Sequence, residues 1–267
     1  APRLLRKMAT GMVTPDAAEA IQSERALIDQ VRSRQTDRRV VTLISGKGGV
    51  GCTTVALALG TVLMAMRDDR TVLVDVQQGT PSLGALSDVG APRTVSSLLT
   101  ETEVVDPPLA ASGLGVVDGA DWDQRIRRDD IAGVLELLGR EHTFNLLDAG
   151  NDPGDGGHTA LARADQVVVV TGPGPMGAAA MRTAHDRVRE VNQMAVAGVI
   201  TVVVCQTEDA HRETQRQLRN TPRTVVLPPD PHLAAGRPMD ASAVSGATRE
   251  AMLRVTALVA SRTTAHG

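Results

Sequence analysis

The sequence predicts an α/β fold in which helices cover both faces of a mostly parallel, twisted sheet. Apolar runs that suit strands alternate along the chain with longer helical patterns, which is the order of successive β–α–β units. Several apolar runs, such as "TVLVDV" and "QVVVVTG", are continuous in Val, Ile and Leu. That continuity is typical of parallel strands that are buried on both faces. We therefore predict a three-layer α/β domain over residues 39–267, preceded by a helical extension over residues 1–38.

The individual elements follow from the same patterns. The expected strands are "RVVTLIS", "TVLVDV", "LGVVDG", "FNLLDAG", "QVVVVTG", "GVITVVVC" and "RTVVLP". Helices are expected at about 53–67, 127–140, 176–192 and 247–262, and "DAHRETQRQLRN" also suits a helix. Two Gly/Pro segments, "DAGNDPGDGG" and "TGPGPMG", follow strands directly. In an open α/β sheet, loops at the carboxyl ends of the strands are where ligands bind.

The extension is expected to contain one helix, "DAAEAIQSERALIDQVRSRQ". Asp16 suits the N-cap, with a glutamate three residues further on. The four residues expected to share its apolar face are Ala17, Ile21, Ile28 and Val31. The last helix is rich in Ala and Val and lacks the bulky apolar face of a membrane-surface helix, so we expect it to pack on the sheet. "RLLRKM" near the start is the better candidate for a peripheral membrane or partner contact.

Composition excludes several classes of function. The net charge is −3, which predicts no general attraction to nucleic acid or anionic membranes. Aromatic residues are nearly absent, with one Trp, one Phe and no Tyr, so platforms that stack single-stranded bases are disfavoured. The six histidines have no zinc-site spacing. The two cysteines form no CxxC pair and no signal peptide is visible, so we expect a cytoplasmic location.

The segment "SGKGGVGCTT" lies between the first expected strand and the following helix. The four glycines in it are Gly46, Gly48, Gly49 and Gly51. Glycines allow a tight turn whose N–H groups point at an anion, and the helix N-terminus adds further free donors. The phosphate-loop pattern G-x-x-x-x-G-K-[ST] is met from Gly46 to Thr53 except at one position, where Cys52 replaces the lysine.

A lysine directly after the first glycine, Lys47 in "KGGVG", resembles the deviant Walker A loop of the MinD/ParA family of P-loop ATPases. "TVLVDVQQGTPSLG" looks like the second strand and switch I of that family, and "FNLLDAGNDPG" looks like its Walker B strand and switch II. Within the family, "TVSSLL", "PPDPHLAAG" and the preceding helix resemble actinobacterial MinD-like proteins associated with type VII secretion. The resemblance covers roughly residues 38–262 and implies a three-layer P-loop fold.

The resemblance also implies a site for ATP or ADP with Mg²⁺. Its nucleotide-binding positions are Gly46, Gly48, Gly49, Val50, Gly51, Cys52, Thr53, Thr54, Gln206, Pro229 and Asp230. The Mg²⁺ positions are Thr53, Asp75 and Asp148. Lys47, which reaches a partner's phosphates in a nucleotide-sandwich dimer, and Gln77 are the catalytic positions. The implied partners are a second copy of the chain and a protein of a secretion or division system.

Three positions depart from the family pattern. Cys52 cannot supply the positive charge of the loop lysine, which predicts weaker triphosphate binding and less stabilisation of the transition state. Gln77 stands where an aspartate helps to position the attacking water, and an amide is a poor base. Gln206 replaces the asparagine that contacts adenine. We therefore expect weak or absent nucleotide binding, with slow or no hydrolysis.

Two interpretations of Cys52 remain open. A thiol at a helix N-terminus beside a lysine and free amides is expected to have a lowered pKa and raised reactivity. The simpler interpretation, which we favour, is a small residue that fills the place of the lysine.

The leading functional hypothesis is a degenerate MinD-like regulator or scaffold, in type VII secretion or in polar or septal positioning. The alternatives are a slow ATPase that depends on dimerisation and a ParA-like partition protein that binds the nucleoid. The last is disfavoured because basic residues are interspersed with acidic ones.

Overall fold

The computed structural model describes residues 15–35, 37–77, 83–100, 106–119, 125–152 and 154–261, and the statements below concern those residues. Their strands form one sheet in the order β3-β4-β2-β5-β1-β6-β7-β8, with parallel pairing throughout. The strands are β1 Arg39–Ser45, β2 Thr71–Asp75, β3 Arg93–Thr94, β4 Gly115–Asp118, β5 Phe144–Gly150, β6 Gln166–Thr171, β7 Ile200–Val204 and β8 Thr224–Leu227. The expected parallel sheet is confirmed. Its two-residue strand β3 was not predicted from the sequence.

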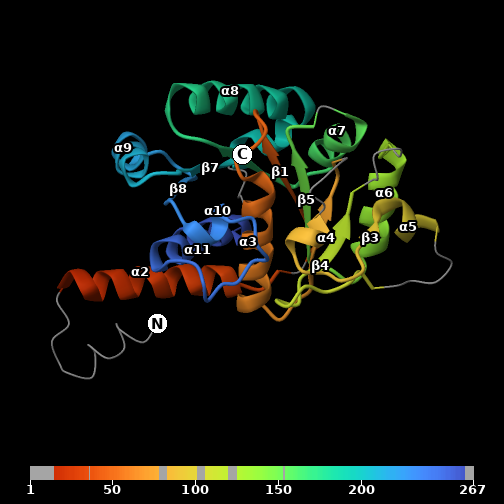
Figure 1. Cartoon of the computed structure of the whole chain (residues 1–267), viewed down its shortest axis with the longest axis horizontal. Coiled ribbons are helices and arrows are strands. Elements are labelled where there is room, and N and C mark those ends of the chain that lie inside the picture. The colour runs from red at the N-terminus through yellow and green to blue at the C-terminus, as the bar shows by residue number, and fades with distance from the viewer. Residues whose placement is uncertain are drawn as a thin grey trace.

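Helices cover both faces of this sheet (Figure 1). They are α2 Pro15–Arg32, α3 Cys52–Met66, α4 Leu83–Leu86, α5 Val95–Thr100, α6 Arg128–Leu138, α7 Asp155–Ala162, α8 Gly174–Val191, α9 Glu208–Leu218, α10 Pro231–Ala234 and α11 Gly246–Ala260, with a 3-10 turn at Gln193–Gly198. The four long helices expected inside the domain are confirmed to within two residues at each end. The shorter α4, α5, α7 and α10 were not expected, and α7 begins within the "DAGNDPGDGG" segment.

Two apolar cores hold the three layers together. On one face, α3 and α11 pack against alternate residues of the strands, including the buried Phe144. On the other face, α5, α6, α7 and α8 pack against the intervening strand residues. Successive strand residues therefore enter opposite cores, as in β1, where Leu43 faces α3 and Ile44 faces α8. This burial on both faces explains why the strand sequences are continuously apolar.

The helix of the extension packs on the domain below α11 (Figure 1). Its apolar contact consists of Leu27, Ile28 and Val31 against Leu253 and Ala257 of α11. The expected face is therefore correct at its C-terminal end, whereas Ile21 is only half-buried and lies outside this cluster.

Polar contacts add to this packing. The Arg67 guanidinium donates hydrogen bonds to the backbone carbonyls of Val31 and Ser33. The Gln35 side-chain amide donates to the Ala260 carbonyl at 2.6 Å. The expected N-cap was wrong by at least one residue, since the helix already includes Pro15 and Asp16 lies within its first turn.

The last helix packs as the sequence predicted. Nine of the 15 residues of α11 are buried, and they contact α2, α3 and the strands β7 and β8. In the described ranges, no helix combines the length and apolar character needed to cross a bilayer. The "RLLRKM" segment lies outside the described residues.

Candidate nucleotide-binding site

The glycine-rich loop joins β1 to α3 at the edge where the parallel strands end. Gly49 and Gly51 have φ angles of 75° and 89°, a left-handed conformation that glycine adopts without steric cost. Gly46 is needed for another reason: a Cβ atom there would lie 1.9 Å from the carbonyl oxygen of Ala180 in α8. Because the N-cap residue Gly51 has no side chain, the first N–H groups of α3 are open to an anionic ligand.

The carboxylate of Asp148 connects this loop to the sheet. Asp148 lies near the end of β5 and is fully buried. The Thr53 hydroxyl donates a hydrogen bond to Asp148 Oδ2 at 2.5 Å, and the Cys52 thiol donates to the same carboxyl group. The Gly150 backbone N–H donates to Asp148 Oδ1 at 3.3 Å. The first turn of α3 is thus tied to the strand that the sequence predicted as the Walker B strand.

Cys52 is a neutral, buried thiol. Burial raises its pKa well above the ordinary value, and the negative charge and hydrogen bond of Asp148 raise the pKa further. The expectation of a lowered Cys52 pKa is therefore wrong, because burial of the thiol, and after it the charge of Asp148, outweigh the effect of the helix N-terminus. The favoured alternative, a small residue in the place of the lysine, agrees with this geometry.

Three acidic residues lie at or near the carboxyl ends of neighbouring strands. Asp75 of β2 lies directly opposite Asp148 in the β2–β5 pairing, and Asp118 ends β4 on the other side of β2. All three are buried. Burial raises the pKa of Asp75 well above its usual range, and repulsion from Asp148 and then Asp118 raises it further. Burial also raises the pKa of Asp148, although hydrogen bonds from Thr53, Cys52 and Gly150 oppose that shift.

Crowded carboxylates with raised pKa values are a suitable environment for a cation, because a positive charge would favour their ionised forms. Among the described residues, no three His, Cys, Asp or Glu side chains are grouped to hold a metal alone. A Mg²⁺ ion here would therefore take the Thr53 hydroxyl, an acidic oxygen and the phosphate oxygens of a nucleotide as ligands. Asp118 was missed from the sequence, although it ends an apolar strand just as Asp75 does.

Gln77 lies between the ends of three strands. Its backbone N–H donates to Asp75 Oδ1 at 2.8 Å. Its side chain covers Gly150, where a Cβ atom would lie 2.2 Å from Gln77 Oε1. The carbonyl oxygen of Gln77 would lie 2.0 Å from a Cβ atom at Gly119, after β4. The structure therefore places this predicted catalytic residue beside the predicted metal-binding carboxylates.

Lys47 projects from the outer part of the loop and is exposed. In the part of the chain that is described, its ammonium group forms no ion pair. The next residue, Gly48, lies beside Asn151, whose amide nitrogen is 3.6 Å from an ideal Cβ position at Gly48. Asn151 was not predicted as a site residue, although it directly follows the strand that contains Asp148. Val50 and Thr54 are half-buried on either side of the start of α3.

The predicted adenine-side residues lie at the same edge of the sheet, beyond β6. Gln206 is exposed after β7, and the half-buried Pro229 follows β8. Asp230 caps α10 and is buried. Its carboxylate accepts hydrogen bonds from the N–H groups of residues 232, 233 and 245 and, at 2.7 Å, from the Thr248 hydroxyl. Burial would raise the pKa of Asp230, but these hydrogen bonds lower it below the usual value.

Asp230 therefore attaches the "PPDPHLAAG" segment to the start of α11. A contact between Asp230 and nucleotide stays a prediction, as do the roles of the other loop and adenine-side residues.

Comparison with known families decides the identity of this fold. Residues 41–237 match the CobQ/CobB/MinD/ParA nucleotide binding domain. The chain belongs to this family. The resemblance seen in the loop and in the later strand ends is thereby confirmed.

A curated relative is the ESX-1 secretion-associated protein EspI of Mycobacterium tuberculosis, present in two strains. It is 27% identical to this MinD/ParA-like chain over 229 residues, which cover 78% of the chain and 34% of the relative. The chain thus spans about a third of the relative's length.

Solved structures show the same fold. The cell division ATPase MinD of Pyrococcus furiosus has a TM-score of 0.65 at 21% identity, covering 83% of this chain and 98% of that one. A putative plasmid partition protein of Borrelia burgdorferi bound to AMPPNP has a TM-score of 0.65 at 16% identity. The match covers 82% of this chain and 98% of that one. The MinC:MinD cell division protein complex of Aquifex aeolicus has a TM-score of 0.62 at 17% identity. The match covers 82% of this chain and 94% of that one.

The environment of Cys52 predicts low reactivity. We expect both thiols of the native protein to react with a disulfide reagent such as DTNB at least about tenfold more slowly than in denaturant, because burial raises the pKa of each. The rate of thiolate release measures this, and a Cys52→Ser variant leaves Cys205 as the remaining thiol. A fast native reaction that disappears in Cys52→Ser would contradict the prediction.

Asp75→Asn is expected to stabilise the protein at neutral pH without Mg²⁺. Because the folded pKa of Asp75 lies above its unfolded value, its stabilising contribution is present at low pH and is lost as the pH rises toward the folded pKa. Asparagine keeps an acceptor for the Gln77 N–H and removes the charge. We expect Tm to rise by at least about 2 °C at pH 7.5. The increase in Tm should become smaller toward about pH 4. An equal increase in Tm at pH 7.5 and at about pH 4 would refute the electrostatic explanation.

Asp230→Asn should have the opposite effect. The folded pKa of Asp230 is lowered, so its contribution is present above the unfolded pKa and is lost as the pH falls through the folded pKa. An amide nitrogen cannot accept the bonds that one carboxylate oxygen accepts from Ser245 and Thr248. We expect a loss of about 1–3 kcal/mol in urea unfolding at pH 7.5. The difference in the free energy of unfolding between the variant and the natural protein should decrease only below about pH 4. A difference that is constant with pH would contradict a role for the charge of Asp230.

Proposed function

We propose that this chain is a MinD/ParA-type module in which ATP hydrolysis is reduced or lost, and that it acts as a regulator or scaffold. The observation that supports this most directly is Cys52. Its neutral thiol donates to Asp148 at the position where the family pattern has a lysine. The loop keeps the backbone geometry of an anion site, because Gly49 and Gly51 still turn it. What it lacks is the charge that would stabilise the transferring phosphoryl group.

The residues around the loop are better suited to binding a nucleotide than to hydrolysing it. Gln77 can hold a water molecule by hydrogen bonds, but an amide is not a general base. Burial raises the pKa values of Asp75 and Asp148, and a cation beside them would favour their ionised forms. A nucleotide with Mg²⁺ would bring that cation, so we propose ATP or ADP with Mg²⁺ as the ligand, bound weakly.

A role in secretion is supported by the relative that is described as ESX-1 secretion-associated. Because the chain covers only 34% of that relative, the role is a proposal for this chain. A protein of a secretion or division system would then be its partner. A cavity of about 830 Å³ between the approach to α6 and the β5–α7 loop offers such a partner a surface next to the predicted switch II. Arg125 and Arg127 are exposed around it, and Arg128 is paired there with Asp155 at 3.1 Å.

The competing proposal is a slow ATPase that depends on dimerisation. The exposed Lys47, which has no ion-pair partner among the described side chains, favours it, since a partner protomer's phosphates could be its ligand. Nucleoid binding has less support. Three exposed arginines of α8 and α9 are paired with acids: Arg189 with Asp186, Arg212 with Asp209 and Arg216 with Glu213.

Calorimetric titration of Mg-ATP and Mg-ADP into the natural protein, Cys52→Lys and Cys52→Ala tests the proposal. We expect weak binding by the natural protein and about tenfold or more tighter binding by Cys52→Lys, since a charged hydrogen bond to phosphate contributes about 1.5–3 kcal/mol. Cys52→Ala should match the natural protein, because the thiol itself contributes no charge. Thermal unfolding of each variant shows whether the fold is kept.

One result would favour the competitor instead. If the natural protein binds ATP at micromolar concentration, and phosphate release rises with protein concentration and is abolished by Lys47→Ala, the chain is a dimerisation-dependent ATPase.

A further inference from the structure

The last strand of the sheet, β8, has one paired edge and one free edge. β8 pairs with β7, with Thr224 opposite Thr201 and Leu227 opposite Val204. The carbonyls of Arg223 and Leu227 accept hydrogen bonds from the β7 side, at 2.9 and 3.1 Å. Because backbone groups alternate in direction along a strand, the N–H and C=O groups of Thr224 and Val226 point away from β7.

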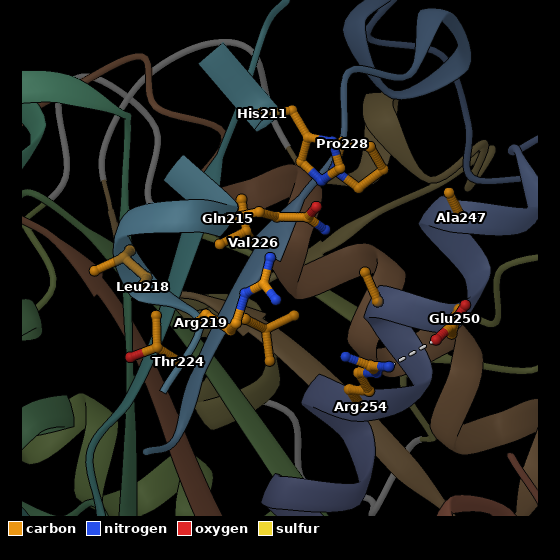
Figure 2. A pocket seen from close by; sticks show the side chains of 12 residues that line it. His211, Gln215, Leu218, Arg219, Thr224, Val226, Pro228, Ala247, Glu250 and Arg254 are labelled. Atoms are coloured by element: carbon orange, nitrogen blue, oxygen red, sulfur yellow. Dashed lines mark hydrogen bonds and ion pairs between the residues drawn. The ribbon is translucent and has the colours of Figure 1, made fainter. Parts of the chain in front are cut away.

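A cavity of about 350 Å³ runs along this free edge. Its two walls are helices, with Gln215 of α9 and the C-cap residue Arg219 on one side and Glu250 and Arg254 of α11 on the other (Figure 2). Val226 lies between the walls (Figure 2). The side chains of Val225 and Leu227 are buried in the core below α11, whereas Thr224 and Val226 are half-buried. The open strand edge is thus the floor of a groove and not an exposed rim.

The shape of the groove selects what can pair with β8. The strand is four residues long, and Pro222 and Pro228, which have no N–H group, bound it. Two helices stand beside the edge, so the sheet of a second folded domain cannot approach it. A single extended segment can approach it, and strand addition to an open edge is an established mode of peptide binding. The accessible length corresponds to about three to five residues at 3.3 Å each.

The charges on the walls select the chemistry of that segment. The Arg219 guanidinium points into the space between the helices and has no ion-pair partner in the described part of the chain (Figure 2). Arg254 is paired with Glu250 at 2.8 Å, so that pair is close to neutral. Near Pro228, His211 Nε2 is buried and has no hydrogen-bond partner among the described groups. The lining therefore offers one free cation and one free imidazole nitrogen, and the acid within it is already paired.

We propose that this groove binds an extended, acidic segment of a partner protein, which adds to β8 as a further strand. The N–H and C=O groups of Val226 pair with the backbone of the segment, and Arg219 binds a carboxylate of the segment. This site lies outside the nucleotide loop and goes beyond the function proposed above. It stands whether or not the chain binds ATP.

Val226→Pro and Val226→Ala form a matched pair of variants for the test. Proline removes the outward N–H and leaves the hydrogen bonds between β7 and β8 in place, since Val226 faces away from β7. Alanine shortens the same side chain and keeps the N–H. Arg219→Glu reverses the wall charge without any change in the backbone, so the test does not depend on the folding of the proline variant.

The probe is a displayed library of random nine-residue peptides, selected on the natural protein and counter-selected on Val226→Pro. We expect enriched peptides with Asp or Glu between apolar residues. Their affinity, measured by fluorescence polarisation, should fall at least tenfold in Val226→Pro and at least fivefold in Arg219→Glu, and change less than twofold in Val226→Ala. Hydrogen exchange at the Val226 amide should slow when peptide is bound.

Three results would overturn the proposal. The first is that no peptide distinguishes Val226→Pro from Val226→Ala. The second is that the enriched peptides are neutral or basic and bind Arg219→Glu as well as they bind the natural protein. The third is that the natural protein alone is a dimer by light scattering, with a protected Val226 amide, and becomes a monomer in Val226→Pro, which would make a second copy the occupant.

Discussion

The buried carboxylate of Asp148 holds the first turn of α3 against the sheet, and the chemistry of the site depends on it. Thr53 and Cys52 both donate to this group, so the glycine loop is oriented by a strand that lies 95 residues further along the chain. A cation at position 52 would compensate the charge of Asp148. The neutral thiol brings no such charge, and burial raises the pKa values of Asp148 and of its neighbour Asp75.

Two buried aspartates at the same sheet edge show how the surroundings decide a residue's role. Asp75 accepts one backbone hydrogen bond and faces another carboxylate, so its ionised form is poorly stabilised. Asp230 is also buried, but four protein donors satisfy it, and its pKa is lowered. The first is suited to a cation that arrives with a ligand. The second already has its partners and holds the segment after β8 against α11.

Helix α11 links the peripheral features to the core. It packs against α3 on one side and against the helix of the extension on another, and it forms one wall of the groove beside β8. Pro228 lines that groove and begins the "PPDPHLAAG" segment. The proposed peptide groove and the proposed adenine side of the nucleotide site therefore share the segment that directly follows β8.

Much of this protein was determined by its sequence alone. Continuous Val, Ile and Leu runs specify strands buried on both faces, and glycines between a strand and a helix specify the phosphate loop, because both depend on local conformation and on burial. The protonation of Cys52 could not be predicted in this way. A helix N-terminus favours a thiolate, and only the tertiary structure buries the thiol and places Asp148 beside it. For the same reason, the packing of α2 on α11 and the groove along β8 required the fold, since each joins residues that are distant in the chain.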